Sequence, residues 1–195
     1  MRWMYRIMLV LASMVAASTI GEAQETRILF DGSQSAFRGS WLNVNDNVMG
    51  GVSTGRYGFT PDGDLRFFGN LSLANNGGFA SVRSRGLPLA LRQDEELWLR
   101  VRGDGRKYNL DLRVPSRRMA FTYRVTMQTV ANQWQEFRVP LQLFRATSFG
   151  RVVASTGPVN AANVNSVGFT ISDKKQGPFQ LDVDWIRAVR APKRR

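Results

Sequence analysis

Apolar and polar residues alternate in short stretches along most of this chain, and turn-forming residues separate the stretches. Alternation with a period of two is typical of β-strands that bury one face, because successive side chains of a strand point to opposite sides. No long stretch has the spacing of an amphipathic helix, and the one short helical piece expected is 141–144, after Pro140. The predicted strands are residues 27–30, 37–44, 64–68, 71–73, 79–84, 96–102, 108–114, 119–129, 134–139, 166–171 and 178–187. Many short strands between Gly, Pro and Asn turns predict an all-β sandwich, formed by one domain over residues 24–190.

Two strands in the middle of the chain are expected to pair. Residues 96–102 and 108–114 flank a turn at Gly103-Asp104-Gly105, which predicts a hairpin. A slip of one residue would turn every side chain to the other face, so few registers keep both apolar sets buried. One of these registers gives the cross-strand pairs Arg100 with Asp111 and Trp98 with Arg113.

The outward side chains of these strands and of 119–129 form a candidate binding surface. Its members are Trp98, Arg100, Arg102, Asp111, Arg113 and Arg124. An ordinary solvated sheet face would carry similar residues. An exposed Trp beside planar hydrogen-bonding groups would also suit a sugar ring or a partner chain. Both interpretations require Trp98 to be at least partly exposed.

The first residues have the pattern of a secretory signal peptide. Arg2 and Arg6 precede or open an apolar block that runs to Ala17, and small residues follow at Gly21-Glu22-Ala23. A basic start, a short apolar block and a small-residue cleavage site define such a leader. We therefore expect residues 1–23 to be removed and the protein to be exported, either periplasmic or secreted. The block is short for a membrane span, so an uncleaved anchor is the alternative and no span is expected after cleavage.

Composition restricts the chemistry. The chain has no histidine and no cysteine, which excludes Ser-His and Cys-His nucleophilic machinery and the commonest transition-metal ligands. The formal net charge of +12 favours acidic partners, although the basic residues are scattered and only the tail at 191–195 is dense. An exported chain without a nucleic-acid-binding motif is not expected to bind nucleic acid. We expect no cofactor, and carboxylates are the groups that remain for catalysis.

Two pairs of carboxylates leave acid–base catalysis and metal binding possible. Asp46 and Asp104 would suit acid–base catalysis only if the fold brought them within about 5–10 Å of each other. Asp182 and Asp184 would suit a structural Ca²⁺ ion, which takes several oxygen ligands. The alternative for this second pair is a set of outward-facing strand acids, because Leu181, Val183 and Trp185 alternate with them.

A loop rich in turn formers spans residues 45–55, with the sequence NDNVMGGVSTG. The glycine pairs in this loop and at Gly77-Gly78 suit backbone conformations with positive φ that side chains resist. A structural turn explains such residues, and a shaped surface loop for binding explains them as well. A polar loop at Asp173–Gln176 is a further candidate surface.

Five segments together resemble the complex I intermediate-associated protein 30 family. They are NDNVMGGVS (45–53), GGFASVR (77–83), VRGDGRKY (101–108), WQEFRVPLQLF (134–144) and GFTISDKKQGPFQLDVDWI (168–186). Their order and spacing extend the resemblance over nearly all of residues 27–190. The resemblance implies a galactose-binding-like jelly-roll β-sandwich and a non-enzymatic, chaperone-like role in assembly of a respiratory complex. An exported copy would use this fold for something else.

Two hypotheses of different classes follow. The first is a protein-interaction or assembly module whose loop-end site comprises Asn45, Asp46, Met49, Gly50, Gly51, Ser53, Gly77, Gly78, Asp104, Arg106, Asp173, Lys174 and Gln176. The alternative is a carbohydrate-binding module that uses the sheet face around Trp98. The partner is accordingly an unidentified protein or a glycan.

Overall fold

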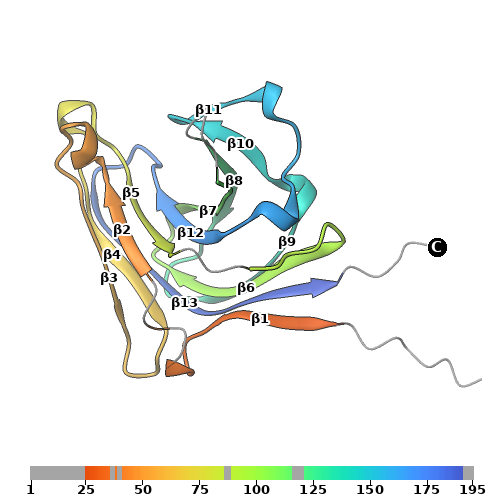
Figure 1. Cartoon of the computed structure of the whole chain (residues 1–195). Coiled ribbons are helices and arrows are strands. Elements are labelled where there is room, and N and C mark those ends of the chain that lie inside the picture. Colours follow the sequence, from red (N-terminus) through yellow and green to blue (C-terminus); the bar gives the residue numbers. More distant parts are fainter. Residues whose placement is uncertain (1–24, 36–37, 39–40, 86–88, 116–120, 191–195) are drawn as a thin grey trace, which may run out of the picture.

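Two antiparallel sheets stack face to face in the computed structural model, which describes residues 25–35, 38, 41–85, 89–115 and 121–190. Sheet A has the strand order β3-β4-β13-β6-β9, and β1 also pairs with β13. Sheet B has the order β11-β10-β8-β7-β12-β5-β2. Figure 1 shows sheet B as a curved layer above the long strands β6 and β13 of sheet A. The predicted all-β sandwich is confirmed.

The bounds of the elements follow the alternating stretches of the sequence closely. Sheet A contains β1 (Thr26–Asp31), β3 (Thr54–Phe59), β4 (Leu65–Leu71), β6 (Glu95–Gly103), β9 (Trp134–Pro140) and β13 (Gly177–Arg190). Sheet B contains β2 (Trp41–Asn45), β5 (Ala80–Ser84), β7 (Lys107–Arg113), β8 (Thr122–Gln128), β10 (Arg145–Ser148), β11 (Arg151–Val152) and β12 (Ser166–Ile171). Short 3-10 helices in the connections are η2 (Asp46–Met49), η3 (Ala74–Asn76), η4 (Leu141–Leu143), η5 (Ala154–Thr156) and η6 (Ala161–Asn163).

The core lies between the two sheets and is built from the inward residues of each strand. Leu97, Leu99 and Val101 of β6 are fully buried on the side that faces sheet B. Leu110 of β7 and Phe169 of β12 are fully buried on the opposing side. Each such side chain contributes about 1.5–3 kcal/mol through removal of apolar surface from water, so this layer dominates the stability of the fold.

Most predicted strands are present, and the differences have local causes. The break at Gly69-Asn70 between the predicted strands 64–68 and 71–73 is wrong, because β4 runs through these two residues and ends at Leu71. Gly69 is required there by close packing: a Cβ at this position would lie 1.7 Å from the Thr54 carbonyl oxygen of the neighbouring strand. Strands β3, β10 and β11 were not predicted, because Gly and polar residues interrupt their alternation. The short helix predicted after Pro140 is confirmed as η4.

The predicted hairpin between 96–102 and 108–114 is wrong. Strand β6 pairs with β13 and β9 in sheet A, and β7 pairs with β12 and β8 in sheet B. The turn at 103–105 therefore carries the chain from one sheet to the other. In each of the two strands, the alternate apolar residues are buried. This pattern fits strands that face each other across a core as well as it fits neighbours in one sheet. Arg100 and Asp111, expected to pair, lie in different sheets.

The alternation along β13 also changes partway. A bulge interrupts the register of β13 with β6 between Val183 and Trp185. Val183 pairs with Val101 and Trp185 pairs with Arg100, so β13 has one extra residue between two consecutive residues of β6. An extra residue in a strand reverses which side chains face the core beyond it. Trp185 consequently shares the outer face with Arg187, and Ile186 enters the core. The expectation that Trp185 shares a face with Val183 is wrong for this reason.

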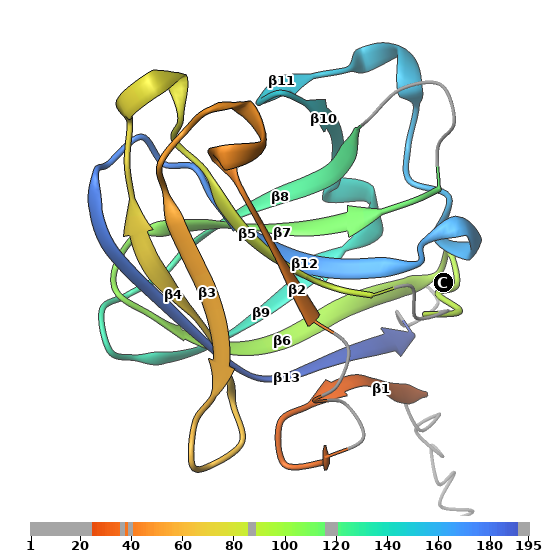
Figure 2. The same cartoon turned by 60° about the vertical axis from the view of Figure 1, so that its left-hand side comes forward.

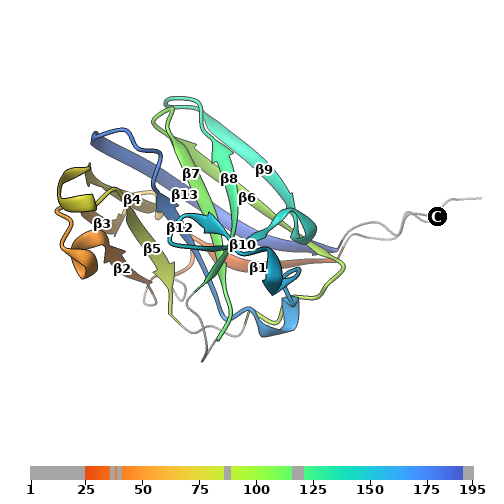
Figure 3. The ribbon, with the colours of Figure 1, turned by 90° about the horizontal axis from the view of Figure 1, so that it is seen from above.

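Sheet B curves, and its concave side faces away from sheet A. Figure 2 shows β2, β5, β12, β7 and β8 side by side in this sheet. In Figure 3, seen from above, η2 and η3 lie together at one side, and β10 lies across from them. The curvature and these connections place loop residues from distant parts of the sequence around one face.

Strand β12 of sheet B supplies a test of the core. Phe169→Ala is expected to lower the free energy of unfolding by about 3–5 kcal/mol, because it leaves a cavity in a fully buried layer. Phe149→Ala is the matched control, because its side chain is 83% exposed and its change should stay within about 0.5 kcal/mol. Urea denaturation measures both. Equal losses for the two variants would contradict this description of the core.

Candidate functional site

The concave face of sheet B holds a groove of about 1120 Å³. Typical small-molecule pockets measure about 300–1,000 Å³, so this groove has room for an extended ligand. Its floor consists of alternate residues of β5, β12, β7 and β8, whose neighbours in sequence point into the core. These floor residues are Ser81, Arg83, Asn109, Arg113, Thr122, Arg124, Thr126 and Thr170.

Hydrogen bonds across the strands make the middle of this floor rigid. Asp111, only 3% exposed, accepts from Arg124 Nε at 2.7 Å, from Arg124 Nη2 at 2.9 Å and from Thr170 Oγ1 at 2.6 Å. Burial acts to lower the pKa of Arg124, but the hydrogen bonds and charge of Asp111 outweigh it and raise that pKa. Thr126 donates to Asn109 Oδ1 at 2.8 Å. Both carboxylate oxygens of Asp111, beneath the middle of the floor, thus accept hydrogen bonds from the same chain.

Apolar side chains surround this polar floor. Six of the exposed large apolar residues in the described part of the chain line the groove, namely Val48, Met49, Leu73, Leu143, Phe149 and Val152. The first three come from η2 and the segment after β4, and the last three come from η4 and from β11 and the turn before it. The two groups belong to opposite edges of sheet B, so they form two apolar walls.

A buried carboxylate holds one of these walls. Asp46, fully buried, accepts from the Ser53 amide at 2.9 Å, the Ser53 hydroxyl at 2.6 Å, the Gly78 amide at 2.7 Å and the Phe79 amide at 3.3 Å. Ser53 Oγ in turn accepts from the Ser72 amide at 3.0 Å. A single side chain therefore joins three segments: the loop after β2, the start of β3 and the loop before β5.

The protonation of Asp46 follows from these contacts. Burial acts to raise its pKa, because the charged form loses hydration. Hydrogen bonds from the Ser53 hydroxyl and from the amides of Gly78, Ser53 and Phe79 outweigh burial, and the pKa lies below its usual value. Asp46 is therefore charged at neutral pH and acts as a structural group.

The two glycine pairs are explained by the same carboxylate. In each pair one glycine has a positive φ, +89° at Gly50 and +121° at Gly78. The other glycine packs on Asp46: a Cβ on Gly51 would lie 2.4 Å from its carboxyl carbon, and a Cβ on Gly77 would lie 2.5 Å from Oδ2. The structural-turn interpretation thus explains the glycines, and the shaped-loop interpretation explains the exposed residues between them.

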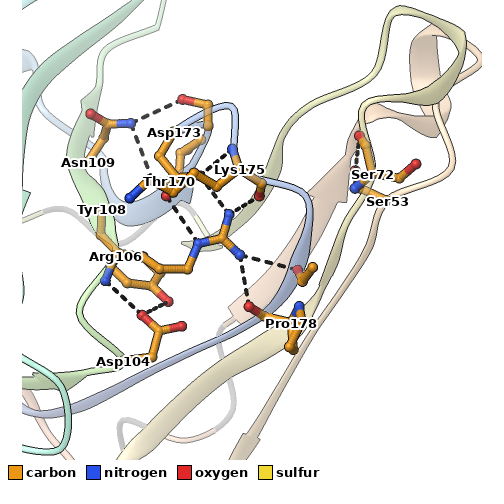
Figure 4. Close-up of polar contacts among 12 residues, drawn as sticks. Ser53, Ser72, Asp104, Arg106, Tyr108, Asn109, Thr170, Asp173, Lys175 and Pro178 are labelled. Atoms are coloured by element: carbon orange, nitrogen blue, oxygen red, sulfur yellow. Dashed lines mark hydrogen bonds and ion pairs between the residues drawn. The ribbon is translucent and has the colours of Figure 1, made fainter.

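A second clamp fixes the Asp173–Gln176 loop (Figure 4). Arg106 donates through Nε to Asp173 Oδ2 at 3.1 Å and through Nη2 to Oδ1 at 2.6 Å. It also donates to the carbonyl oxygens of Lys175, Gly177 and Pro178. Burial acts to raise the pKa of Asp173, but Arg106 outweighs it, and that pKa is lowered. The clamp holds the loop whose Lys174 lines the groove.

Asp104, proposed as the partner of Asp46 in acid–base chemistry, is also occupied by its own chain. Its Oδ1 accepts from the Tyr108 hydroxyl and the Arg106 amide, each at 3.1 Å, and its Oδ2 accepts from the Gln180 amide at 2.9 Å. Burial raises the pKa of Tyr108, and the charge of Asp104 raises it further. Both acids of the candidate pair therefore have structural partners.

The outer face of sheet A carries the rest of the predicted sheet-face site. Trp98 is half-buried, which confirms that it is partly exposed, but Arg138 lies 4.0 Å over its ring centroid. Arg100 pairs with Asp184 at 2.5 Å, and Arg102 pairs with Asp182 at 2.9 Å. The predicted sheet-face set is thus divided between the two opposite outer surfaces of the sandwich.

The acids of β13 complete this outer network. Asp182, fully buried, also pairs with Arg66 at 2.7 Å, so two guanidinium groups cover it. Among the residues that the structure describes, no group of three or more His, Cys, Asp or Glu side chains is arranged to hold a metal ion. The outward orientation expected for Asp182 and Asp184 accounts for their arginine partners.

The structure assigns the predicted residues to three places. The groove is lined by Met49, Gly77, Gly78, Arg113, Arg124 and Lys174. Supporting positions in or beneath the loops and floor are held by Asn45, Asp46, Gly50, Gly51, Ser53, Asp104, Arg106, Asp111 and Asp173. Gln176 is exposed outside the groove lining, and Trp98, Arg100 and Arg102 lie on the opposite face.

Sequence reasoning missed several residues of the groove. Arg83 and Leu143 stood within two of the quoted segments, but neither was singled out. Phe149 and Val152 lie in a Gly-containing stretch where no strand was predicted. The sequence signal that could have identified the apolar walls is an apolar residue inside a turn-forming segment, such as Val48.

Comparison with known proteins agrees with the resemblance of the five segments. The model of the complex I intermediate-associated protein 30 family matches residues 28–183. This chain belongs to that family. "Complex I intermediate-associated protein 30, mitochondrial" of Mus musculus is 29% identical over 193 residues, covering 87% of this chain and 58% of the mouse protein. The Drosophila melanogaster protein of the same name is 25% identical over 184 residues, covering 83% of this chain and 62% of its own length.

Solved structures show the same fold. The family 11 carbohydrate-binding module of the cellulase Lic26A-Cel5E of Clostridium thermocellum superposes with a TM-score of 0.63 at 13% identity, covering 89% of this chain and 99% of the module. At that identity the likeness shows the two-sheet β-sandwich fold and says nothing of the ligand. This chain spans less than two thirds of the mouse and fly family members.

The exported location predicted from residues 1–23 is wrong. The names of the family members of mouse, fly and Caenorhabditis elegans all contain the word mitochondrial, which points to that compartment instead of the periplasm or the exterior. An apolar block behind arginines shows that a segment prefers apolar surroundings, and this preference alone does not fix a destination. Residues 1–23 and the tail at 191–195 lie outside the described residues.

No helix within the described ranges is long and apolar enough to cross a membrane.

The Asp46 contacts predict a stability effect that depends on pH. Asp46→Asn should cost at least about 2 kcal/mol at pH 7, because the amide nitrogen would face buried donors. The folded-state pKa of Asp46 lies below its unfolded value, so its contribution is complete above about pH 4 and is lost as pH falls through the folded value. Urea denaturation between pH 7 and pH 2 should therefore show wild type and variant converging in acid.

Asp62→Asn is the control for this experiment, because Asp62 is an exposed acid in a turn. It should leave the free energy of unfolding within about 0.5 kcal/mol of wild type. A constant difference between wild type and Asp46→Asn down to pH 2 would show that the carboxylate charge is not the stabilising feature.

Proposed function

We propose that this protein is a non-enzymatic binding factor that holds a segment of a partner protein in the concave groove of sheet B. The observation that carries the proposal is the set of six exposed apolar side chains that form two walls beside one polar floor. Single exposed apolar residues are normal on a protein surface, whereas residues gathered around one groove mark an interaction site. Protein interfaces combine apolar contact area with direct hydrogen bonds, and the groove offers both.

We infer the role of the binding factor from the names of its relatives. Because the mouse and fly family members are named complex I intermediate-associated proteins, we take the partner to be a subunit or assembly intermediate of respiratory complex I. The absence of histidine and cysteine and the occupied carboxylates of Asp46 and Asp104 support a role without catalysis. The factor would then stabilise an intermediate by binding it.

The residues that line the groove and the residues that hold its loops would have different roles. Met49 and Lys174 would contact the partner directly, as members of the lining. Asp46 and Arg106 would act as positioning residues, because each holds a loop from which lining residues project. Their loss should weaken binding through displacement of the walls.

The carbohydrate-binding alternative has less support. The face around Trp98 offers no open aromatic platform, because Arg138 covers one side of the ring and the neighbouring Trp134 ring has Arg100 and Arg102 over it, each at 4.7 Å. A sugar ring would have to displace these guanidinium groups before it could stack. The remaining support is the fold likeness, which does not identify a ligand.

A tiled peptide array of the complex I subunits tests the proposal. The full chain should bind a limited set of peptides, and Val152→Ser should weaken that binding about tenfold because it removes one buried aliphatic contact. Val130→Ser is the matched control, since Val130 is 43% exposed but lies outside the groove lining.

The same proteins should be tested on a panel of soluble polysaccharides with Trp98→Ala. Peptide binding that is lost in Val152→Ser and kept in Val130→Ser and Trp98→Ala is the expected result. Saturable polysaccharide binding that is lost in Trp98→Ala, without peptide binding, would overturn the proposal in favour of a carbohydrate-binding module.

A further inference from the structure

The charged side chains that line the groove are all positive. They are Arg83, Arg113, Arg124, Arg145 and Lys174, and no carboxylate is among the lining residues. Asp111 lies beneath this surface and is used by Arg124 and Thr170. A concave surface with charges of one sign concentrates ligands of the opposite sign.

Three of these five cations, Arg83, Arg113 and Lys174, have no side-chain hydrogen bond or ion pair within the described residues, and Arg83 and Arg113 are the two that lie on the floor. Arg124 is paired with Asp111, and Arg145 donates to the carbonyl oxygens of Gln142 and Phe144. In the part of the chain that the structure describes, neither Arg83 nor Arg113 has a carboxylate within 4.0 Å. Arg113 Nε is buried and has no hydrogen-bond acceptor. Buried donors in native proteins almost always have a partner, so this one lacks an acceptor that a ligand could supply.

The strand register brings these two arginines to the same part of the floor. Arg83 of β5 pairs with Gly168 of β12, and Arg113 of β7 pairs with Ser166 on the other side of β12. Neighbouring strands lie about 4.8 Å apart, so the two main chains are separated by about 10 Å, which long side chains span from both sides. Gly168 carries no side chain between them, and a Cβ there would lie 2.4 Å from the Val82 carbonyl oxygen.

The electrostatic surroundings of Arg113 agree with this placement. Burial lowers the pKa of Arg113, and the positive charge of Arg83 lowers it further, more than Asp111 restores it. Two guanidinium groups that repel each other at the edge of a cavity are stabilised by an anion between them, and a carboxylate fits the guanidinium fork with two parallel hydrogen bonds.

We propose that Arg83 and Arg113 form an anion-binding site in the groove and that its ligand is a carboxylate of an acidic segment in the partner protein. This inference rests on the proposed function, because it names the chemistry of the segment that the groove holds. The apolar walls favour this source of the anion. A glutamate or aspartate flanked by aliphatic residues satisfies the cationic floor and covers the rim, whereas free phosphate would leave the rim exposed to water.

Two labelled decapeptides test the inference with the full chain. One carries two glutamates among leucine and valine residues, and the other carries glutamines in their place. Fluorescence anisotropy at about 50 mM salt should show at least about tenfold tighter binding of the glutamate peptide, the loss expected when a charge-assisted pair is removed. Arg83→Gln and Arg113→Gln should each reduce this preference to about threefold or less.

Arg138→Gln is the matched control, because it removes the same charge from the opposite face of the sandwich. It should retain the preference for the glutamate peptide, which separates a local site from the overall charge of +12. Thermal unfolding of the free proteins provides a second measurement. Arg113→Gln should melt at or above the wild-type temperature, since its Nε has no partner to lose.

Three results would overturn the inference. Equal affinity of wild type for the two peptides would show that no carboxylate is recognised, while the subunit array would still decide the proposed function separately. Inorganic phosphate that displaces the glutamate peptide at micromolar concentration would assign the site to a free anion. A melting temperature of Arg113→Gln far below wild type would show that Arg113 serves the fold.

Discussion

The four hydrogen bonds to the Asp46 carboxylate are the interaction on which the shape of the groove depends. The loop after β2 and the start of β3, which are near each other in the sequence, meet the distant loop before β5 at this one group. Two of the apolar wall residues, Val48 and Met49, project from the first of these segments. A charged group without hydration is tolerated here because its hydrogen bonds replace the lost water. The wall is therefore rigid enough to present apolar side chains to solvent.

The two outer surfaces of the sandwich use similar residues in opposite ways. On sheet A, arginines, tryptophans and acids are matched to one another through pairs such as Arg102 with Asp182 and Arg138 with Trp98. On the concave side of sheet B, neither Arg83 nor Arg113 has a carboxylate partner among the described residues, and apolar side chains line the groove beside them. A surface whose charged groups are already paired within the chain gains little free energy when it binds a partner. A surface with unpaired charges and exposed apolar area gains more. This contrast, more than the presence of tryptophan, distinguishes the candidate binding face.

Much of the local structure was predictable because it depends on short-range rules. Residues 166–171 form β12 with the predicted bounds, since Val167, Phe169 and Ile171 alternate with small or polar residues and turn residues flank the strand. The glycines, asparagines and Asp46 of residues 45–55 predicted a loop, with a structural turn and a shaped surface loop as alternatives, but they did not predict that Asp46 is buried. The exported location was wrong because the composition of residues 1–23 describes a preference for apolar surroundings and does not specify a compartment.

The alternation of residues along each strand determined which side chains enter the core, and the five family segments determined the family. Only the tertiary structure decided which strands are neighbours. Residues 96–102 and 108–114 have compatible patterns for pairing, yet they lie in different sheets, and Trp98 and Arg113 consequently face opposite sides of the molecule. Side-chain alternation is a property of one strand, whereas strand pairing depends on contacts between residues that are distant in sequence. The bulge after Val183 shows the same limit, because one extra residue reverses the faces without any change in composition.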